Sequence, residues 1–313
     1  ESRAVKTPVI AILDSGVDAA HPDLRDKIWR NGGERPGDGV DNDANGYADD
    51  VNGWDFVLDV PDPSPKPAPT ADALAQTHGT IVAGLAAASS HNAQGISGVS
   101  WRARILPLRV LDAEGNGTVY TVIRAIQYAT RARVDVINLS FVGPERSELL
   151  TEALKAAASA GVVVVAAAGN SAAGNAPTNL DASRRYPVCD DADSDIPYVL
   201  GVAAVDRRLA RPTFTNYGSR CVDLAAPGEA IFSTIARGAA QPDAAAAYAD
   251  HLGSRVFSGT SLAAPLVAGV AAVVKSLRPD LGAAQVIAVL KASAADLAPT
   301  AGVVDGHIVL IFG

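Results

Sequence analysis

The chain has 313 residues, 48% hydrophobic and 19% charged, with a formal net charge of −8. This composition can fill a large core and excludes a disordered chain, while the acidic balance argues against nucleic acid or an anionic membrane as a partner. The longest apolar runs, around residues 156–168 and 262–274, are broken by glycine or proline. No run is therefore expected to reach the ~18 residues of a membrane helix, and a soluble protein is predicted.

In chain order, short apolar runs alternate with helical candidates. The apolar runs end in turn residues, as buried parallel strands do; they cover residues 9–13, 105–110, 136–139, 162–167, 199–204 and 222–225. Helices are predicted over residues 78–88, 119–131, 148–160, 261–277 and 283–294. This alternation predicts an α/β fold with a mostly parallel sheet covered by helices on both faces.

The whole chain, residues 1–313, is interpreted as a single domain. Residues 61–69 are rich in proline, but they lie between two motifs of one domain, so they are predicted to be a surface excursion and not a linker. Residues 237–252 are predicted to be a second surface insertion.

Three motifs carry the residue types that acyl transfer requires. Asp14 lies in VIAILDSGVD, His78 in QTHGTIVAGL and Ser261 in FSGTSLAAPLVAG. A serine hydroxyl is a weak nucleophile unless an imidazole removes its proton and a carboxylate orients that imidazole. Ser261 would begin a helix whose first turn tolerates Pro265. There the Ser261 N–H and the amide of Asn170, which follows another predicted strand, could converge on a developing oxyanion.

In this order, Asp, His and Ser resemble the motifs of the subtilisin-like serine proteases, the subtilases. The similarity runs from about Val9 to about Asp305 and includes DSGVD, HPDL, HGT-x-VAG, the AGN segment ending at Asn170, GTS-x-A and the closing GVVD. Two positions depart from the pattern, because Ile81 stands where the family usually has a second His and Leu262 where it has Met. The resemblance implies a subtilisin-like fold.

The resemblance further implies a secreted serine endopeptidase that hydrolyses extended protein or peptide substrates through an acyl-enzyme. Asp14, His78 and Ser261 would form the triad, and Asn170 would assist the oxyanion hole. The chain would be a mature catalytic domain, made as a zymogen with an inhibitory N-terminal pro-segment and acting as a monomer. Two alternatives stay open: a peptide ligase or macrocyclase on the same scaffold, and a catalytically silent calcium-dependent binding module.

Members of the family bind the substrate peptide as an added strand between two enzyme segments. The matching segments here are residues 114–117 and 139–143, and the predicted contacts are Gly115, Gly117, Ser140, Val142 and Gly143. The family's pocket for the residue before the scissile bond is lined by the segment from Asn170 to Tyr186-Pro187. Asp181 would lie at its floor and favour Arg or Lys, unless Arg184 or Arg185 neutralises it or the loop turns it to solvent.

An acidic stretch, DGVDNDANGYADD over residues 38–50, is the second informative feature. Its Asp-x-Asp-x-Asn-Gly core reproduces the first half of an EF-hand loop, but Asn52 replaces the bidentate Glu and no helix pair flanks it. Some subtilases hold a structural calcium ion in a similar insertion. The predicted Ca²⁺ ligands are Asp41, Asp43, Asn45, the Tyr47 carbonyl, Asp49 and Asp50. The alternative is a solvated turn, although so many carboxylates without a cation would repel one another.

Cys189 and Cys221 are the only cysteines. Each would precede a strand, and consecutive parallel strands are often neighbours. In an oxidising, extracellular setting a disulfide between them is a reasonable prediction. Two independent buried thiols are the alternative.

Overall fold

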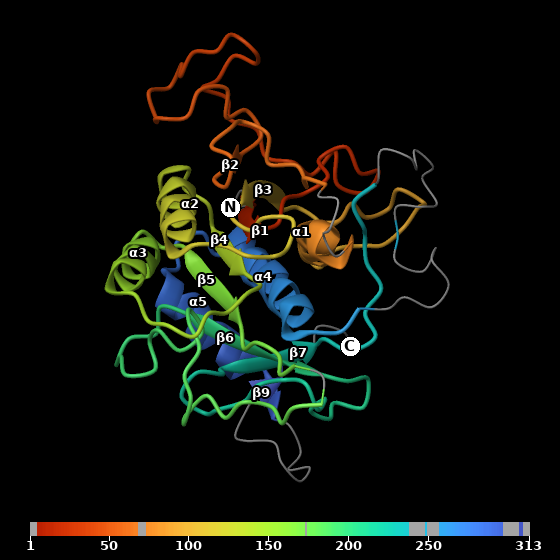
Figure 1. The fold of residues 1–313 in the computed structure, drawn as a ribbon, viewed down its shortest axis with the longest axis vertical. Coiled ribbons are helices and arrows are strands. Elements are labelled where there is room, and N and C mark those ends of the chain that lie inside the picture. The colour runs from red at the N-terminus through yellow and green to blue at the C-terminus, as the bar shows by residue number, and fades with distance from the viewer. Residues whose placement is uncertain are drawn as a thin grey trace.

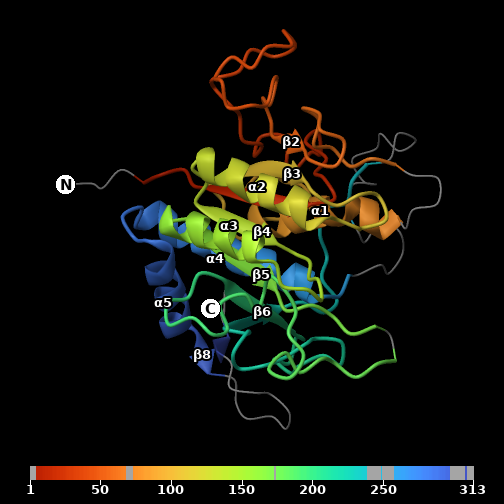
Figure 2. The same cartoon turned by 60° about the vertical axis from the view of Figure 1, so that its left-hand side comes forward.

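The computed structural model describes residues 5–67, 73–172, 174–237, 248, 257–296 and 307–308. Within these residues one sheet has the strand order β2-β3-β1-β4-β5-β6-β7-β9-β8 (Figures 1 and 2). Every neighbouring pair is parallel except β8 and β9. The strands are β1 Val9–Asp14, β2 Trp54–Asp55, β3 Arg104–Arg109, β4 Val136–Leu139, β5 Val163–Ala167, β6 Leu200–Val205, β7 Leu224–Pro227, β8 Ala295–Asp296 and β9 His307–Ile308.

Helices cover both faces of the sheet (Figures 1 and 2). They are α1 Ala73–Ala87, α2 Val119–Arg131, α3 Glu148–Ser159, α4 Thr260–Leu277 and α5 Ala283–Ser293. Side chains of β1 alternate between the two core layers. Ala11 and Leu13 pack in the layer of α2 and α3, whereas Ile10 and Ile12 pack in the layer of α1, α4 and α5. A strand buried on both faces must be apolar at every position, which explains the continuous runs in the sequence.

The predicted fold class is confirmed, and the predicted elements differ from the observed ones mainly at their ends. Helix α1 begins at Ala73, five residues before the predicted start. Strands β2 and β8 have two residues each, and β9 is described over two, which is too short to leave a periodic signal. The predicted closing GVVD segment, residues 68–69 of the proline-rich excursion and most of 237–252 lie outside the described residues.

Helix α4 corrects one prediction. It continues for 18 residues through Pro265, with a mean hydropathy of 1.6, so by length and composition alone it could cross a membrane. Residues such as Ala264, Val267, Ala268 and Ala271 are fully buried in the core layer of α1 and α5, and 67% of the helix is buried. These contacts identify α4 as a core helix. Pro265 is its sixth residue, beyond the first turn, and not within it as predicted.

The two cysteines form a disulfide. Cys189 and Cys221 are bonded, both are buried, and they join segments that lead into the paired strands β6 and β7. The bond closes a loop across a sequence separation of 32 residues. The disulfide prediction is therefore confirmed.

Candidate active site

Asp14 is the last residue of β1, so it lies at the carboxyl ends of the parallel strands. Its side chain is fully buried, and Oδ1 accepts a hydrogen bond of 2.7 Å from the Ser15 amide. Both carboxylate oxygens also contact Nδ1 of His78, at 2.8 and 3.0 Å. A buried carboxylate in this position fixes the orientation of the imidazole ring.

His78 projects from α1 and keeps 22% of its side chain exposed. Burial is the largest single effect on its pKa and favours the neutral ring. The charge of Asp14 and the hydrogen bond to it act in the opposite direction and together outweigh burial, so the pKa of His78 is raised above its ordinary value. A histidine held in this way can serve as a general base near neutral pH.

Ser261 is the second residue of α4, directly after the N-cap Gly259 and Thr260. Packing brings this helix end close to α1, because Leu262 and Ile81 belong to one buried apolar cluster. These are the two positions at which the sequence departs from the family pattern. Two apolar side chains therefore meet there, one turn beyond His78 and one residue beyond Ser261.

Asn170 faces the start of α4. Its Oδ1 accepts a 2.9 Å hydrogen bond from the Thr260 amide, while the Gly169 amide donates to Thr260 Oγ1 at 2.9 Å. A Cβ atom placed on Gly259 would lie 3.1 Å from both Asn170 Nδ2 and Ser261 Oγ. A donor amide and a hydroxyl thus border the same small space, and this space is open because residue 259 has no side chain.

A family model described as "Subtilase family" matches residues 5–312. The chain belongs to the subtilase family. Thermitase of Thermoactinomyces vulgaris is 37% identical over 267 residues, covering 85% of this chain and 74% of that protein. "Subtilisin-like protease 1" of Plasmodium berghei (strain Anka) is 30% identical over 310 residues, or 95% of this chain. The chain spans only 47% of the length of that second relative.

Solved structures agree with this assignment. A protease structure from Pseudoalteromonas arctica PAMC 21717 superposes with a TM-score of 0.70 and 28% identity, covering 93% of this chain and 85% of that one. A cold-adapted subtilisin-like serine proteinase gives a TM-score of 0.68 at 26% identity, covering 97% and 89%. The predicted subtilisin-like fold is therefore confirmed.

The two predicted substrate-binding segments of this subtilase differ in exposure: residues 114–117 are exposed, whereas residues 139–143 are buried or partly buried. Gly115 and Gly117 are exposed, and Gly117 forms an antiparallel bridge with Leu111. In the second segment, the amide and carbonyl of Gly143 are both hydrogen-bonded to Tyr186, at 2.7 and 2.9 Å. Backbone pairing with a peptide at Gly143 would require breaking this bridge. Ser140 is buried, whereas Val142 is partly exposed.

Asp181 has a structural use in this loop. Its carboxylate accepts hydrogen bonds of 3.0 Å from the amides of Ser219 and Arg220, and the residue is exposed. Arg184, the expected neutralising partner, pairs with Asp193 instead. A carboxylate that caps an exposed turn argues against the predicted preference for Arg or Lys before the scissile bond.

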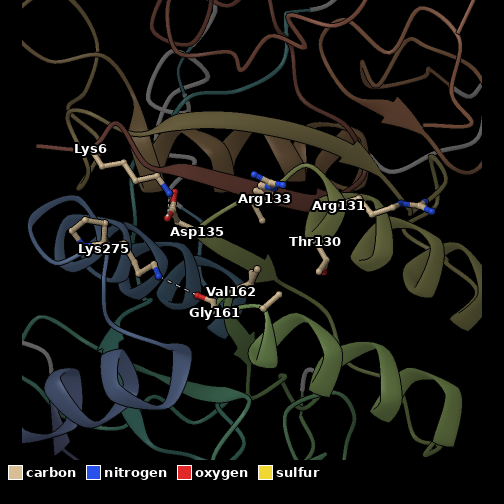
Figure 3. A pocket seen from close by; sticks show the side chains of 11 residues that line it. Lys6, Thr130, Arg131, Arg133, Asp135, Gly161, Val162 and Lys275 are labelled. Carbon is tan, nitrogen blue, oxygen red and sulfur yellow. Dashed lines mark hydrogen bonds and ion pairs between the residues drawn. The ribbon is translucent and has the colours of Figure 1, made fainter. Parts of the chain in front are cut away.

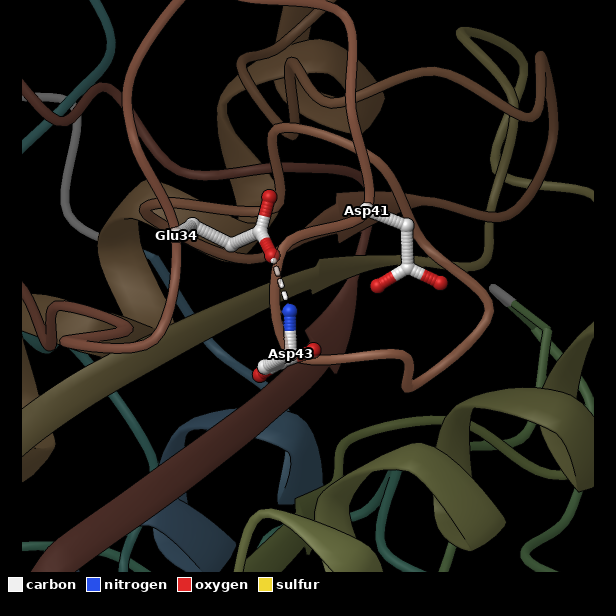
Figure 4. Close-up of side chains that lie close together, drawn as sticks. All are labelled: Glu34, Asp41 and Asp43. Atoms are coloured by element: carbon white, nitrogen blue, oxygen red, sulfur yellow. Dashed lines mark hydrogen bonds between the residues drawn. The ribbon is translucent and has the colours of Figure 1, made fainter.

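The acidic insertion projects from the body of the molecule, as the orange loop in Figure 1 shows. Within the described residues, one group of acidic side chains could hold a metal ion: Glu34, Asp41 and Asp43, which offer oxygens all within 4.8 Å of one another (Figure 4). Glu34 Oε1 also accepts the Asp43 amide at 3.1 Å. Glu34 is not among the predicted ligands, because it precedes the acidic run and no ligand spacing marks it.

The other predicted ligands of the insertion have different surroundings. Asp49 accepts hydrogen bonds from the amides of Gly37 and Gly39. Asp50 is fully buried and accepts side-chain hydrogen bonds from Tyr128, Asn45 and Asn31. Asp50 thus ties the insertion to α2, and neither aspartate joins the group of three carboxylates. The ligand roles predicted for Asn45 and the Tyr47 carbonyl stay predictions.

A cavity of about 550 Å³ lies at the opposite, amino-terminal ends of the strands (Figure 3). Its lining includes Lys6, which pairs with Asp135 at 2.6 Å, and Lys275, which donates to the carbonyls of Gly161 and Leu281 at 3.2 and 2.9 Å. Burial lowers the pKa of Lys275. These cations are used by the carboxylate and by carbonyls beyond helix ends. Because the cavity lies where the strands begin and Asp14 lies where β1 ends, the cavity is remote from the Asp14–His78 pair and is not the candidate active site.

Proposed function

We propose that this chain is a secreted serine endopeptidase that hydrolyses peptide bonds in extended segments of proteins. The observation that carries the proposal is the Asp14–His78 pair, which lies beside the start of α4. Ser261 is the second residue of this helix, and Asn170 accepts a hydrogen bond from the Thr260 amide. Membership of the subtilase family supports the reaction class. The disulfide supports secretion, because disulfides persist mainly in oxidising compartments.

In the proposed mechanism, Ser261 Oγ attacks the scissile carbonyl and His78 accepts the hydroxyl proton. The carbonyl oxygen becomes an oxyanion, which the Asn170 amide and the Ser261 N–H stabilise. His78 then donates its proton to the leaving amine, and the C–N bond breaks to give the acyl-enzyme. Water, deprotonated by His78, hydrolyses the ester and restores Ser261. Asp14 orients the ring and stabilises its charged form.

We also propose that the insertion holds a structural calcium ion through Glu34, Asp41 and Asp43. Three carboxylates from one loop converge, and none of them forms an ion pair with Lys or Arg within the described part of the chain. An all-oxygen donor set suits a hard divalent cation such as Ca²⁺. When bound, the ion would neutralise the repulsion among these carboxylates and stabilise the loop, without taking part in acyl transfer.

A fluorophosphonate probe tests the enzyme directly. Labelling at Ser261, abolished by Ser261→Ala, is expected, together with peptide products whose mass includes one added water. Joined or cyclic products would instead identify a ligase. Absence of labelling in a folded, calcium-loaded protein would reject the enzyme and favour a binding module.

A further inference from the structure

Helix α4 has an unusual beginning, because the nucleophile and a proline are four residues apart. In a regular α-helix the amide of residue 265 would donate to the carbonyl of Ser261. Pro265 has no N–H, and its ring crowds that carbonyl. The Ser261 carbonyl therefore lacks its helical partner although it lies in the second residue of a buried helix.

The hydroxyl of Ser140 supplies this missing partner. Ser140 lies just beyond β4, is only 6% exposed, and its Oγ donates to the Ser261 carbonyl at 2.8 Å across 121 residues of sequence. The direction of this bond is set by Asn138, which is fully buried and whose Nδ2 donates to Ser140 Oγ at 2.9 Å. Since Oγ accepts one hydrogen bond from Asn138, its own proton is available for Ser261.

We propose that Ser140 is a positioning residue for the nucleophile, its hydroxyl replacing the amide that Pro265 lacks. The inference rests on the proposed role of Ser261 and gives the Ser140 side chain a function other than the predicted contact with substrate. The hydrogen bonds from Asn138 to Ser140 and from Ser140 to Ser261 connect the buried end of β4 to the Ser261 carbonyl. Holding this carbonyl restrains the backbone at Ser261, and through it the directions of Oγ and of the N–H in the preceding peptide unit. Small errors in such directions are costly in catalysis.

A double-mutant cycle tests the proposal. Ser140→Ala should lower kcat and the rate of phosphonylation by a fluorophosphonate about tenfold, with KM changed by less than about twofold. Pro265→Ala restores an amide at position 265. In that background Ser140→Ala should lower kcat and the phosphonylation rate by less than about twofold, because the new amide at position 265 can donate to the Ser261 carbonyl.

Ser276 offers a matched control on the same helix. It is also 6% exposed, and its hydroxyl donates to the Val273 carbonyl at 2.7 Å, far from the nucleophile. Ser276→Ala removes the same kind of bond and should leave kcat and phosphonylation unchanged. Melting temperatures of all variants, measured with Ser261→Ala added to prevent self-digestion, separate lost stability from lost positioning.

Three results would overturn the proposal. A raised KM with unchanged kcat and phosphonylation would mean that Ser140 only binds substrate. An equal loss in the Ser140→Ala variant with and without Pro265→Ala would mean that the hydroxyl does not act through the Ser261 carbonyl. If Ser140→Ala alone fails to fold, the double variant should fold and react, and its failure would equally reject the idea. Wild-type protein that does not react with the probe would reject the proposed function itself.

Discussion

Nδ1 of His78 lies 2.8 and 3.0 Å from the two carboxylate oxygens of Asp14. With Nδ1 held in this way, Nε2 is the nitrogen that accepts and returns the proton in the proposed mechanism. That mechanism requires the neutral ring as base, so every effect that stabilises the charged ring should reduce activity at low pH. The net effect of burial and of Asp14 is to raise the pKa of His78.

The acid limb of the pH profile should therefore have its midpoint above the ordinary histidine value of about 6.5. Asp14→Asn removes the charge that raises the pKa, so the midpoint should move to lower pH while kcat falls by about 10⁴. The profile of kcat/KM, with an NMR titration of His78 in the Ser261→Ala protein, measures both effects. A midpoint unaffected by Asp14→Asn would contradict the assigned role of Asp14.

Gly259→Ala should damage the proposed oxyanion site without removing any polar group. The new Cβ would lie 3.1 Å from both Ser261 Oγ and Asn170 Nδ2, so it would fill or distort the space between them. We expect kcat to fall about 10²-fold, similar to the loss expected for Asn170→Ala. Since both variants damage the same site, their effects should not add in the double variant.

The matched control is Gly282→Ala, at the N-cap of α5. A Cβ there meets only Gln285 Oε1, at 3.8 Å. This variant should retain full kcat. A loss as large as that of Gly259→Ala would show that any added methyl group at a helix start perturbs the enzyme, and the steric argument would fail.

The disulfide should contribute mainly to stability. Closing a loop of 32 residues is worth about 3–4 kcal/mol in chain entropy of the unfolded state. Replacing both Cys189 and Cys221 by Ser should lower the free energy of unfolding by about this amount, measured by denaturant titration in the Ser261→Ala background. Below the melting temperature kcat should be unchanged. An unaltered unfolding free energy would mean that native-state strain cancels the entropic gain.

The parts of this molecule that the sequence predicts are those with a local signal. Strand β4 and helix α2 were predicted at their observed ends, because an uninterrupted buried run and a regular amphipathic pattern are visible in a few residues. Short motifs predict the triad of Asp14, His78 and Ser261, and the structure brings Asp14 and His78 together. A contact made by a loop that folds back on itself leaves no such signal, and this is how Glu34 meets Asp41 and Asp43.

Side-chain direction in loops is equally invisible in spacing. The sequence predicts Asp181 at the floor of the pocket, but it cannot show that two amides, from residues 219 and 220, decide where its carboxylate points. The hydrogen bond between Ser140 and Ser261 depends on the missing amide at Pro265 and on how α4 packs against β4. Both relationships become visible only when the strands and helices are assembled.

The calcium proposal makes the last prediction. Chelation should lower the melting temperature of the Ser261→Ala protein, because an ion that binds only the folded state stabilises it by mass action. Glu34→Gln should lower the melting temperature in calcium and abolish most of the response to chelation. The charge-matched control is Asp26→Asn, since the Asp26 side chain is 80% exposed and outside the group of three carboxylates. The response of this variant to chelation should equal that of wild type.

Wild-type activity on a small substrate at low temperature should survive brief chelation, because the Asp14–His78 pair and Ser261 need no metal. If instead Glu34→Gln responded to chelation as strongly as wild type, the ion would bind elsewhere, and if a folded wild-type protein lost activity at once on chelation, the metal would have a role in catalysis.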